Sequence, residues 1–163
     1  MIVIALGANL RSRAGAPRDT LKAALTELSR NGVRIVSVSS YYITKAWPEP
    51  SDPPFINAVA QVHTALTPSE LMAQLHRTEQ AFGRVRAAKN APRTLDLDLL
   101  DFEGRVEAGP PQLPHPRLAS RGFVLVPLAD IAPHWRHPSS GKSVSALIAE
   151  LAADARAVER LTD

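Results

Sequence analysis

"APRTLDLDLLDF", residues 91–102, alternates leucine with aspartate, and both the fold and the site depend on this stretch. Leucines at every second position predict a half-buried strand with one apolar face. The same alternation places Asp96 and Asp98 together on the other face, roughly 6.5–7 Å apart along the strand. Asp is depleted in strands, and two like charges on one face repel each other. The pair therefore needs a compensating charge.

Two interpretations of this aspartate pair are open. The preceding residues are basic, with cations at Arg84, Arg86, Lys89 and Arg93, so the carboxylates could form structural ion pairs on a solvated face. Alternatively, the stretch holds what a phosphate-transferring site needs: hard oxygen ligands for Mg²⁺ and cations for phosphate oxygens. Bound Mg²⁺ would then cancel the repulsion between the two aspartates.

The residues upstream of this strand predict a regular alternation of elements. An apolar run at 2–6 predicts a strand, and leucines and alanines at helical spacing from Pro17 predict a helix that stops at Asn31-Gly32. Residues 33–42 and 55–66 predict two further strands, separated by a loop with four prolines in twelve residues.

A second helix is indicated by "TPSE" at 67–70, which is a capping box with proline at the first helical position. This helix is expected to begin at Pro68 and to end near Gly83. The resulting order, β-α-β-β-α-β, predicts an α+β fold with a ferredoxin-like core: an antiparallel sheet with both helices on one face. The other face of the sheet needs a cover or a ligand.

The C-terminal third is expected to provide that cover. Residues 110–128 predict a proline-rich segment followed by a short apolar strand, and residues 144–157 predict an amphipathic helix. "SSGKSV" at 139–144 lacks the first glycine of a phosphate-binding loop and follows no strand. His134 and His137 lie between prolines, which favours a surface turn over a metal site.

Composition limits the class of protein. At 163 residues and 45% hydrophobic content, the chain is expected to form one domain over 1–163. It has no apolar run of 18 residues, no basic leader and no cysteine, so we expect a cytoplasmic protein without a membrane partner. The net charge of +3 is mild and its arginines are scattered, which suits an anionic small molecule. We expect a monomer.

Four stretches, taken in order, resemble the 6-hydroxymethyl-7,8-dihydropterin pyrophosphokinase family. They are "LGANL" at 6–10, "FINAV" at 55–59, "GRVR" at 83–86 with "PRTLDLDLL" at 92–100, and "PHPRLASRGFVLVPL" at 114–128. The resemblance implies an enzyme of folate synthesis that transfers a pyrophosphoryl group from ATP to the pterin hydroxymethyl oxygen and releases AMP. It also implies a three-layer αβα fold with an enlarged, mainly antiparallel sheet.

The resemblance also implies roles for individual residues. Asp96 and Asp98 would hold two Mg²⁺ ions, with Asp96 also near the pterin, and Arg84 and Arg93 would act in catalysis. The nucleotide would be bound by His76, Glu79, Arg84, Arg86, Arg93, His115 and Arg121. The pterin would be bound by Thr44, Trp47, Phe55, Asn57 and Phe123. Asn57 can offer both a donor and an acceptor to the ring edge, and the two phenylalanines can stack on its faces.

This sequence departs from the family pattern at three positions. His76 stands where other members have Gln, Asn90-Ala91 replaces a Trp-Gly pair, and Pro116 replaces a Tyr that follows the nucleotide-binding His. The alternative function is a ferredoxin-like module that binds a small ligand or RNA without catalysis. An RNA reader needs stacking aromatics, but aromatics make up only 5% of this chain. We therefore expect ATP and the pterin as partners, and no nucleic acid.

Overall fold

A computed structural model describes residues 1–85 and 87–162, so the expected phosphate ligand Arg86 lies outside the described residues. The strands are β1 (Ile2–Ala8), β2 (Arg34–Val38), β3 (Tyr42–Thr44), β4 (Phe55–His63), β5 (Asp96–Phe102) and β6 (Glu159–Arg160). The helices are α1 (Pro17–Arg30), α2 (Pro68–Ala81), α3 (Gly122–Ile131), α4 (Val144–Glu150) and α5 (Ala153–Arg156), with a 3₁₀ turn at Leu118–Ser120. Among the described residues, no helix is both long and apolar enough to cross a bilayer.

The strands form one six-stranded sheet in the order β5-β1-β4-β3-β6, and β2 pairs with the far end of β4. Every pairing is antiparallel. The predicted βαββαβ core and the enlarged antiparallel sheet are both confirmed.

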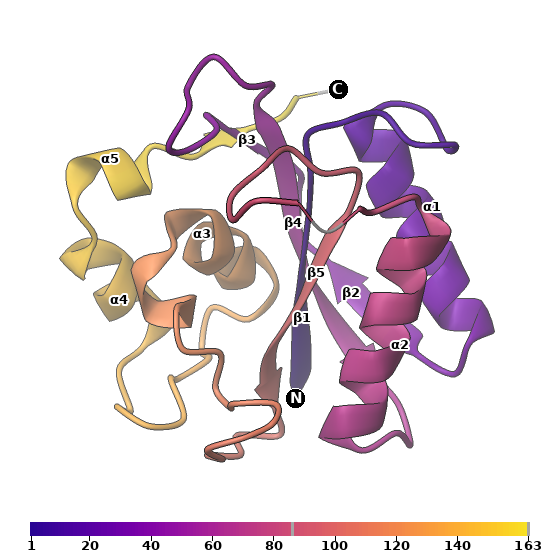
Figure 1. Ribbon diagram of the computed structural model, residues 1–163. Helices are drawn as coiled ribbons and strands as arrows, with labels where there is room; N and C mark the ends of the chain where they lie inside the picture. The colour runs from indigo at the N-terminus through magenta and orange to yellow at the C-terminus, as the bar shows by residue number, and fades with distance from the viewer. Residues whose placement is uncertain (86, 163) are drawn as a thin grey trace.

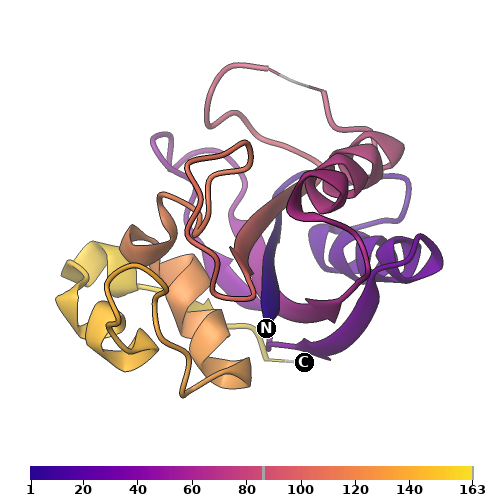
Figure 2. The same ribbon diagram turned by 90° about the horizontal axis from the view of Figure 1, so that it is seen from below.

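Three layers make up the molecule (Figure 1), with α1 and α2 on one face of the sheet and α3, α4 and α5 on the other. The view from below shows the sheet between these two groups of helices (Figure 2). Each face carries its own apolar core: α1 and α2 pack on Leu97 and Leu99 of β5, whereas α3 and α4 pack on Leu100. Burial of these two cores is the main stabilising term of the fold.

The alternation in β5 sorts its side chains between these layers as predicted. Leu97 and Leu99 are buried in the first core, and Asp96 and Asp98 lie on the opposite face. Leu100 shares the face of the aspartates and is buried in the second core. The register with β1 shifts between Val3 and Ile4, and this bulge returns Phe102 to the first core. The aspartates therefore lie on the same side as the second core, where α3 leaves the N-terminal end of β5 uncovered.

The capping box predicted at the start of α2 is present. The Thr67 hydroxyl accepts the Glu70 backbone N–H at 3.3 Å, and the Glu70 carboxylate accepts the Thr67 backbone N–H at 2.8 Å. At the other end, Gly83 adopts φ +81°, the left-handed conformation that glycine tolerates best. These two signals fix where the basic loop after α2 begins.

Three expected elements differ from those observed. The short apolar strand expected before residue 128 is helix α3, because a run that is apolar at almost every position has no periodicity that separates strand from helix. The single strand expected over 33–42 is divided into β2 and β3. Between these strands, the side-chain hydroxyl of Ser39 accepts a hydrogen bond from the Val59 backbone N–H. The helix expected over 144–157 is two helices, interrupted by extended backbone at Leu151.

Candidate active site

A cleft of about 470 Å³ opens over the N-terminal end of β5. Its walls come from the end of α2, the basic loop after it, the start of β5, and the turn before α3. It is lined by His76, Glu79, Arg84, Val85, residues 87–93, Asp96, Leu97, Asp98, His115, Pro116, Arg117 and Arg121. All the described residues predicted for the nucleotide and for catalysis therefore line one cleft.

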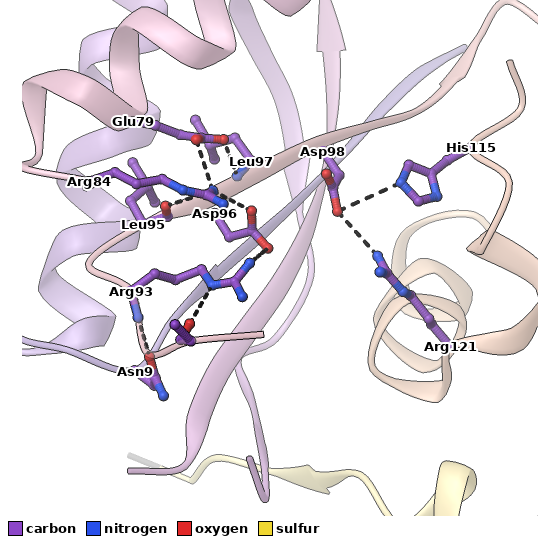
Figure 3. A network of polar contacts seen from close by, with 11 residues as sticks. Asn9, Glu79, Arg84, Arg93, Leu95, Asp96, Leu97, Asp98, His115 and Arg121 are labelled. Carbon is purple, nitrogen blue, oxygen red and sulfur yellow. Dashed lines mark hydrogen bonds and ion pairs between the residues drawn. The ribbon is translucent and has the colours of Figure 1, made fainter. Parts of the chain in front are cut away.

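Asp96 is held by two arginines from the basic loop (Figure 3). One carboxylate oxygen contacts the Arg84 guanidinium, and the other lies 3.1 Å from Nη1 of Arg93. The Arg84 guanidinium also donates to the Leu95 carbonyl at 3.2 Å. The charge that Asp96 needs for compensation is thus supplied by two cations.

A buried carboxylate, Glu79, supports this arrangement from α2. It is 7% exposed, accepts the Leu97 backbone N–H at 3.1 Å, and lies 2.8 Å from Nη1 of Arg84. Burial raises the pKa of Glu79 to about 7, although the Leu97 N–H and Arg84 oppose the shift. Leu97 separates the two aspartates, so Glu79 fixes the strand between them.

Asp98 lies on the same face of β5 as Asp96, but its partners come from the α3 layer (Figure 3). Its Oδ2 lies 3.2 Å from Nη1 of Arg121 and 4.0 Å from Nε2 of His115. Nδ1 of His115 accepts the Arg117 backbone N–H at 3.1 Å, which leaves Nε2 to face the carboxylate. Burial lowers the pKa of His115, Asp98 opposes this, and Arg121 and Arg117 add to it.

Asn9 ties three loops together at the edge of the cleft, and the sequence interpretation assigned it no role. Its side chain accepts the Arg93 backbone N–H at 2.8 Å and donates to the Pro53 carbonyl at 2.9 Å. The Arg93 carbonyl in turn accepts the backbone N–H groups of Asn9 and Leu10. The available signal was the position of Asn9 directly after the first strand, within "LGANL". Lys89 and Arg117 also line the cleft without having been assigned to it.

Apart from Asp96, the residues expected to bind the pterin are not among those that line this cleft. Asn57 is buried on β4 and donates its amide to the Thr44 hydroxyl at 2.9 Å. Across the sheet, Gly7 of β1 pairs with Asn57 on one side and with Asp96 on the other. A Cβ on Gly7 would lie 3.2 Å from Oδ1 of Asn57 and 3.9 Å from Phe55. Gly7 therefore keeps space open next to Asn57 and Phe55.

Two of the three aromatic residues predicted for the pterin contact arginines of the site. The Arg93 guanidinium stacks on Phe55 at 5.9 Å, and the Arg121 guanidinium stacks on Phe123 at 5.5 Å. One phenylalanine therefore contacts an arginine that binds Asp96, and the other contacts the arginine that binds Asp98. Trp47 is 74% exposed on the proline-rich loop.

The model of the 7,8-dihydro-6-hydroxymethylpterin-pyrophosphokinase (HPPK) family matches residues 3–133 of this chain. The chain belongs to this family. A named HPPK of Synechocystis sp. is 41% identical over 151 residues, covering 91% of this chain and 75% of that protein. One from Pseudomonas aeruginosa is 39% identical over 162 residues, covering 98% of this chain and 96% of that protein. The resemblance stated from the sequence is thus confirmed.

Solved HPPK structures share the fold. A Plasmodium falciparum HPPK-DHPS crystal structure with SDX-DHP superimposes with a TM-score of 0.65 at 13% identity, over 90% of this chain and 42% of that chain. Another, with pterin and p-hydroxybenzoate, gives a TM-score of 0.67 at 14% identity, again over 90% and 42%. This chain therefore spans less than half the length of those proteins, and the likeness establishes the fold alone.

The carboxylates of this HPPK family member suit a metal that arrives with its ligand. In the part of the chain that the structure describes, no group of three or more His, Cys, Asp or Glu could hold a metal unaided. Asp96 and Asp98 line the cleft as hard oxygen donors, whereas the third carboxylate of the lining, Glu79, is buried and bound by the Leu97 N–H and Arg84. Mg²⁺ is commonly bound by one or two carboxylates, with phosphate oxygens and waters completing its shell. The donor set therefore fits Mg²⁺ bound together with a nucleotide.

Proposed function

We propose that this chain transfers the pyrophosphoryl group of ATP to the hydroxymethyl oxygen of 6-hydroxymethyl-7,8-dihydropterin, giving the pterin diphosphate and AMP for folate synthesis. One observation carries the proposal: two carboxylates on a bare sheet face, each with its own cationic partners, in a chain of the HPPK family. Relatives of almost the same length are named as this enzyme. They favour catalysis over a module that only binds a ligand.

The arginines and His115 are the nucleotide's partners in this proposal. Arg84, Arg93 and Arg121 offer planar donors that match phosphate oxygens, and such charge-assisted bonds are roughly twice as strong as neutral ones. In the structure these donors contact Asp96 and Asp98. When ATP enters, the arginines exchange a carboxylate for a phosphate.

Each aspartate then needs a new cation. Asp96 and Asp98 would hold two Mg²⁺ ions. These ions would neutralise charge on the β and γ phosphates during transfer. The position of Glu79, buried and already bound to Arg84, keeps that arginine at the cleft wall while its contact with Asp96 opens.

The pterin would lie along the row formed by Asp96, Gly7 and Asn57. Asn57 and Thr44 supply hydrogen bonds at its edge, and Phe55 and Phe123 supply apolar faces. Trp47, on the exposed loop, would cover the ring once both substrates are bound. This arrangement places the pterin next to the carboxylates and the nucleotide in the cleft beyond them.

The reaction itself is a single displacement. The pterin oxygen forms a bond to the β phosphorus in line with the bond that breaks, which joins this phosphorus to the oxygen bridging to the α phosphate. AMP leaves with that oxygen, and the proton of the pterin hydroxyl is released to solvent. The chain contributes positioning and charge stabilisation, which account for most of the catalysis in phosphoryl transfer. No covalent intermediate is involved, and a monomer in the cytoplasm suffices.

Nucleotide analysis after incubation with ATP, Mg²⁺ and the reduced pterin tests the proposal. We expect AMP and pterin diphosphate in equal amounts, with ADP absent. Asp98→Asn serves as the control, because it keeps the size of the side chain and removes its charge. Formation of ADP would indicate an ordinary kinase, and binding without turnover would indicate the module.

A further inference from the structure

The C-terminal segment, residues 151–161, returns from α4 and contacts both walls of the site. Its helix α5 packs against the start of α3, and its strand β6 pairs with β3 (Figure 1). The match to the HPPK family model ends at residue 133. A role for this segment therefore has to be derived from its own contacts.

The contact at α3 leaves no space for a side chain. A Cβ on Gly122 would lie 1.8 Å from the Ala155 carbonyl oxygen and 3.4 Å from the Leu151 side chain. Contacts under 3.0 Å with backbone require a neighbouring segment to move. Gly122 is thus required for close approach between α3 and α5.

The contact at β3 is a backbone pairing. Tyr42 and Ile43 pair with Arg160 and Glu159, and the Leu161 N–H donates to the Tyr41 carbonyl at 2.8 Å. β3 has only three residues, and β6 covers the edge that β4 does not pair with. The segment therefore holds a very short strand in place.

Each contact is adjacent to a residue of the site. Gly122 directly follows Arg121, which reaches Asp98 at 3.2 Å. Ile43 directly precedes Thr44, which accepts the Asn57 amide at 2.9 Å. A third link joins the two walls directly, because the Tyr42 hydroxyl donates to Asp130 of α3 at 2.8 Å.

We propose that the C-terminal segment is a positioning element that sets where Arg121 and Thr44 stand, and hence the separation of the nucleotide and pterin subsites. This inference rests on the proposed function. It assigns each contact to one substrate: α5 against Gly122 serves the nucleotide, and β6 against β3 serves the pterin.

Two variants of the full-length chain test this assignment through separate KM values. Gly122→Ala forces α3 and α5 apart and should raise the KM for ATP roughly 10- to 100-fold, since a displacement of about 1 Å can cost that much. Leu161→Pro removes the N–H that bonds Tyr41 and should raise the KM for pterin about 2- to 10-fold. Thr162→Pro is the matched control and should leave both KM values unchanged.

A merely structural role predicts a different pattern. Partial unfolding lowers the active fraction, so apparent kcat falls while both KM values stay at the wild-type level. That pattern in both variants would overturn the proposal. If Gly122→Ala does not fold, Leu161→Pro still decides the pterin half.

The dissociation constant of a non-hydrolysable ATP analogue separates this inference from the proposed function. Measured by calorimetry, it should rise in Gly122→Ala and stay unchanged in Leu161→Pro. A folded Gly122→Ala protein with wild-type affinity contradicts the positioning role even if the wild type does not turn over. A wild type that binds the analogue but forms no AMP from ATP and the pterin contradicts only the proposed function.

Discussion

The two aspartates of β5 are two residues apart, yet they are held from opposite layers of the molecule. Asp96 is held from the α2 layer, by Arg84 and Arg93, with buried Glu79 behind Arg84. Asp98 is held from the α3 layer, by Arg121 at 3.2 Å and by His115 at 4.0 Å. The site therefore draws residues from both layers. Asp96 and its arginines, the Asp96 side, make more polar contacts than Asp98 and its partners, the Asp98 side.

This difference in contacts predicts different roles for the two groups of residues. The Asp96 side is anchored to a buried carboxylate and to the backbone of β5, so its arginines are pre-positioned. The Asp98 side depends on the position of α3. We therefore expect substitutions on the Asp96 side to affect chemistry and those that move α3 to affect nucleotide binding.

The largest effect is expected from the aspartates themselves. Asp96→Ala and Asp98→Ala should each lower kcat by at least about 10³-fold, because each removes a ligand that no neighbouring side chain replaces. Stability should change by less than about 1 kcal/mol, as these partly exposed ion pairs contribute little. Steady-state kinetics and thermal unfolding measure the two effects. Near-normal turnover in Asp98→Ala would instead support the other interpretation, that the two aspartates form structural ion pairs on a solvated face.

Arg93→Ala should come next, with a fall in kcat of roughly 10²-fold and a smaller change in the KM for ATP. Its guanidinium contacts charge that redistributes during transfer, so its loss is felt mainly in the transition state. Arg93→Lys is the control, since it keeps the positive charge and loses the planar, two-pronged set of N–H donors of the guanidinium. A change confined to KM would show that Arg93 only binds the ground state.

Asn57→Ala should weaken pterin binding without affecting the chemical step. Loss of its amide leaves ring donors and acceptors unpaired, which costs roughly 1–3 kcal/mol, or about 5- to 150-fold in the KM for pterin. The kcat should change little. Thr44→Val is the companion variant, because it removes only the hydroxyl that Asn57 contacts. An unchanged pterin KM in Asn57→Ala would remove this residue from the site.

The smallest effect concerns stability and pH at Glu79. Burial raises its pKa in the folded state to about 7, above its ordinary value of 4.5. Between these values the folded state binds more protons than the unfolded state, so stability falls as pH rises from about 4.5 to about 7 and then levels off. Glu79→Gln should remove this component of the slope. A melting-temperature profile identical to that of the wild type would show that Glu79 does not titrate there.

The local features of this fold were readable from the sequence. Alternation in β5 predicted that Asp96 and Asp98 share a face, and the capping box predicted the start of α2 at Pro68. Both depend on residues within a few positions of each other. The same reasoning failed for α3, because its sequence is apolar at almost every position and so resembles a buried strand.

Long-range contacts could not be predicted. Asn9 meets Arg93 across 84 residues, and Gly122 meets Ala155 only because α5 folds back over α3. Glu79 was expected at the nucleotide and lines the cleft, but its contacts with Leu97 and Arg84 were not predicted. Each case depends on the packing of one layer against another, which local patterns do not encode.

Binding of Mn²⁺ in the presence of a non-hydrolysable ATP analogue, followed by electron paramagnetic resonance, tests the central claim most directly. That claim is that Asp96 and Asp98 act as one metal-binding pair, filled when the nucleotide draws the arginines away. The wild type should bind two ions per chain with the analogue and far less Mn²⁺ without it. Asp96→Asn and Asp98→Asn should each weaken this binding. Equal Mn²⁺ binding in the wild type and in both variants would contradict the account.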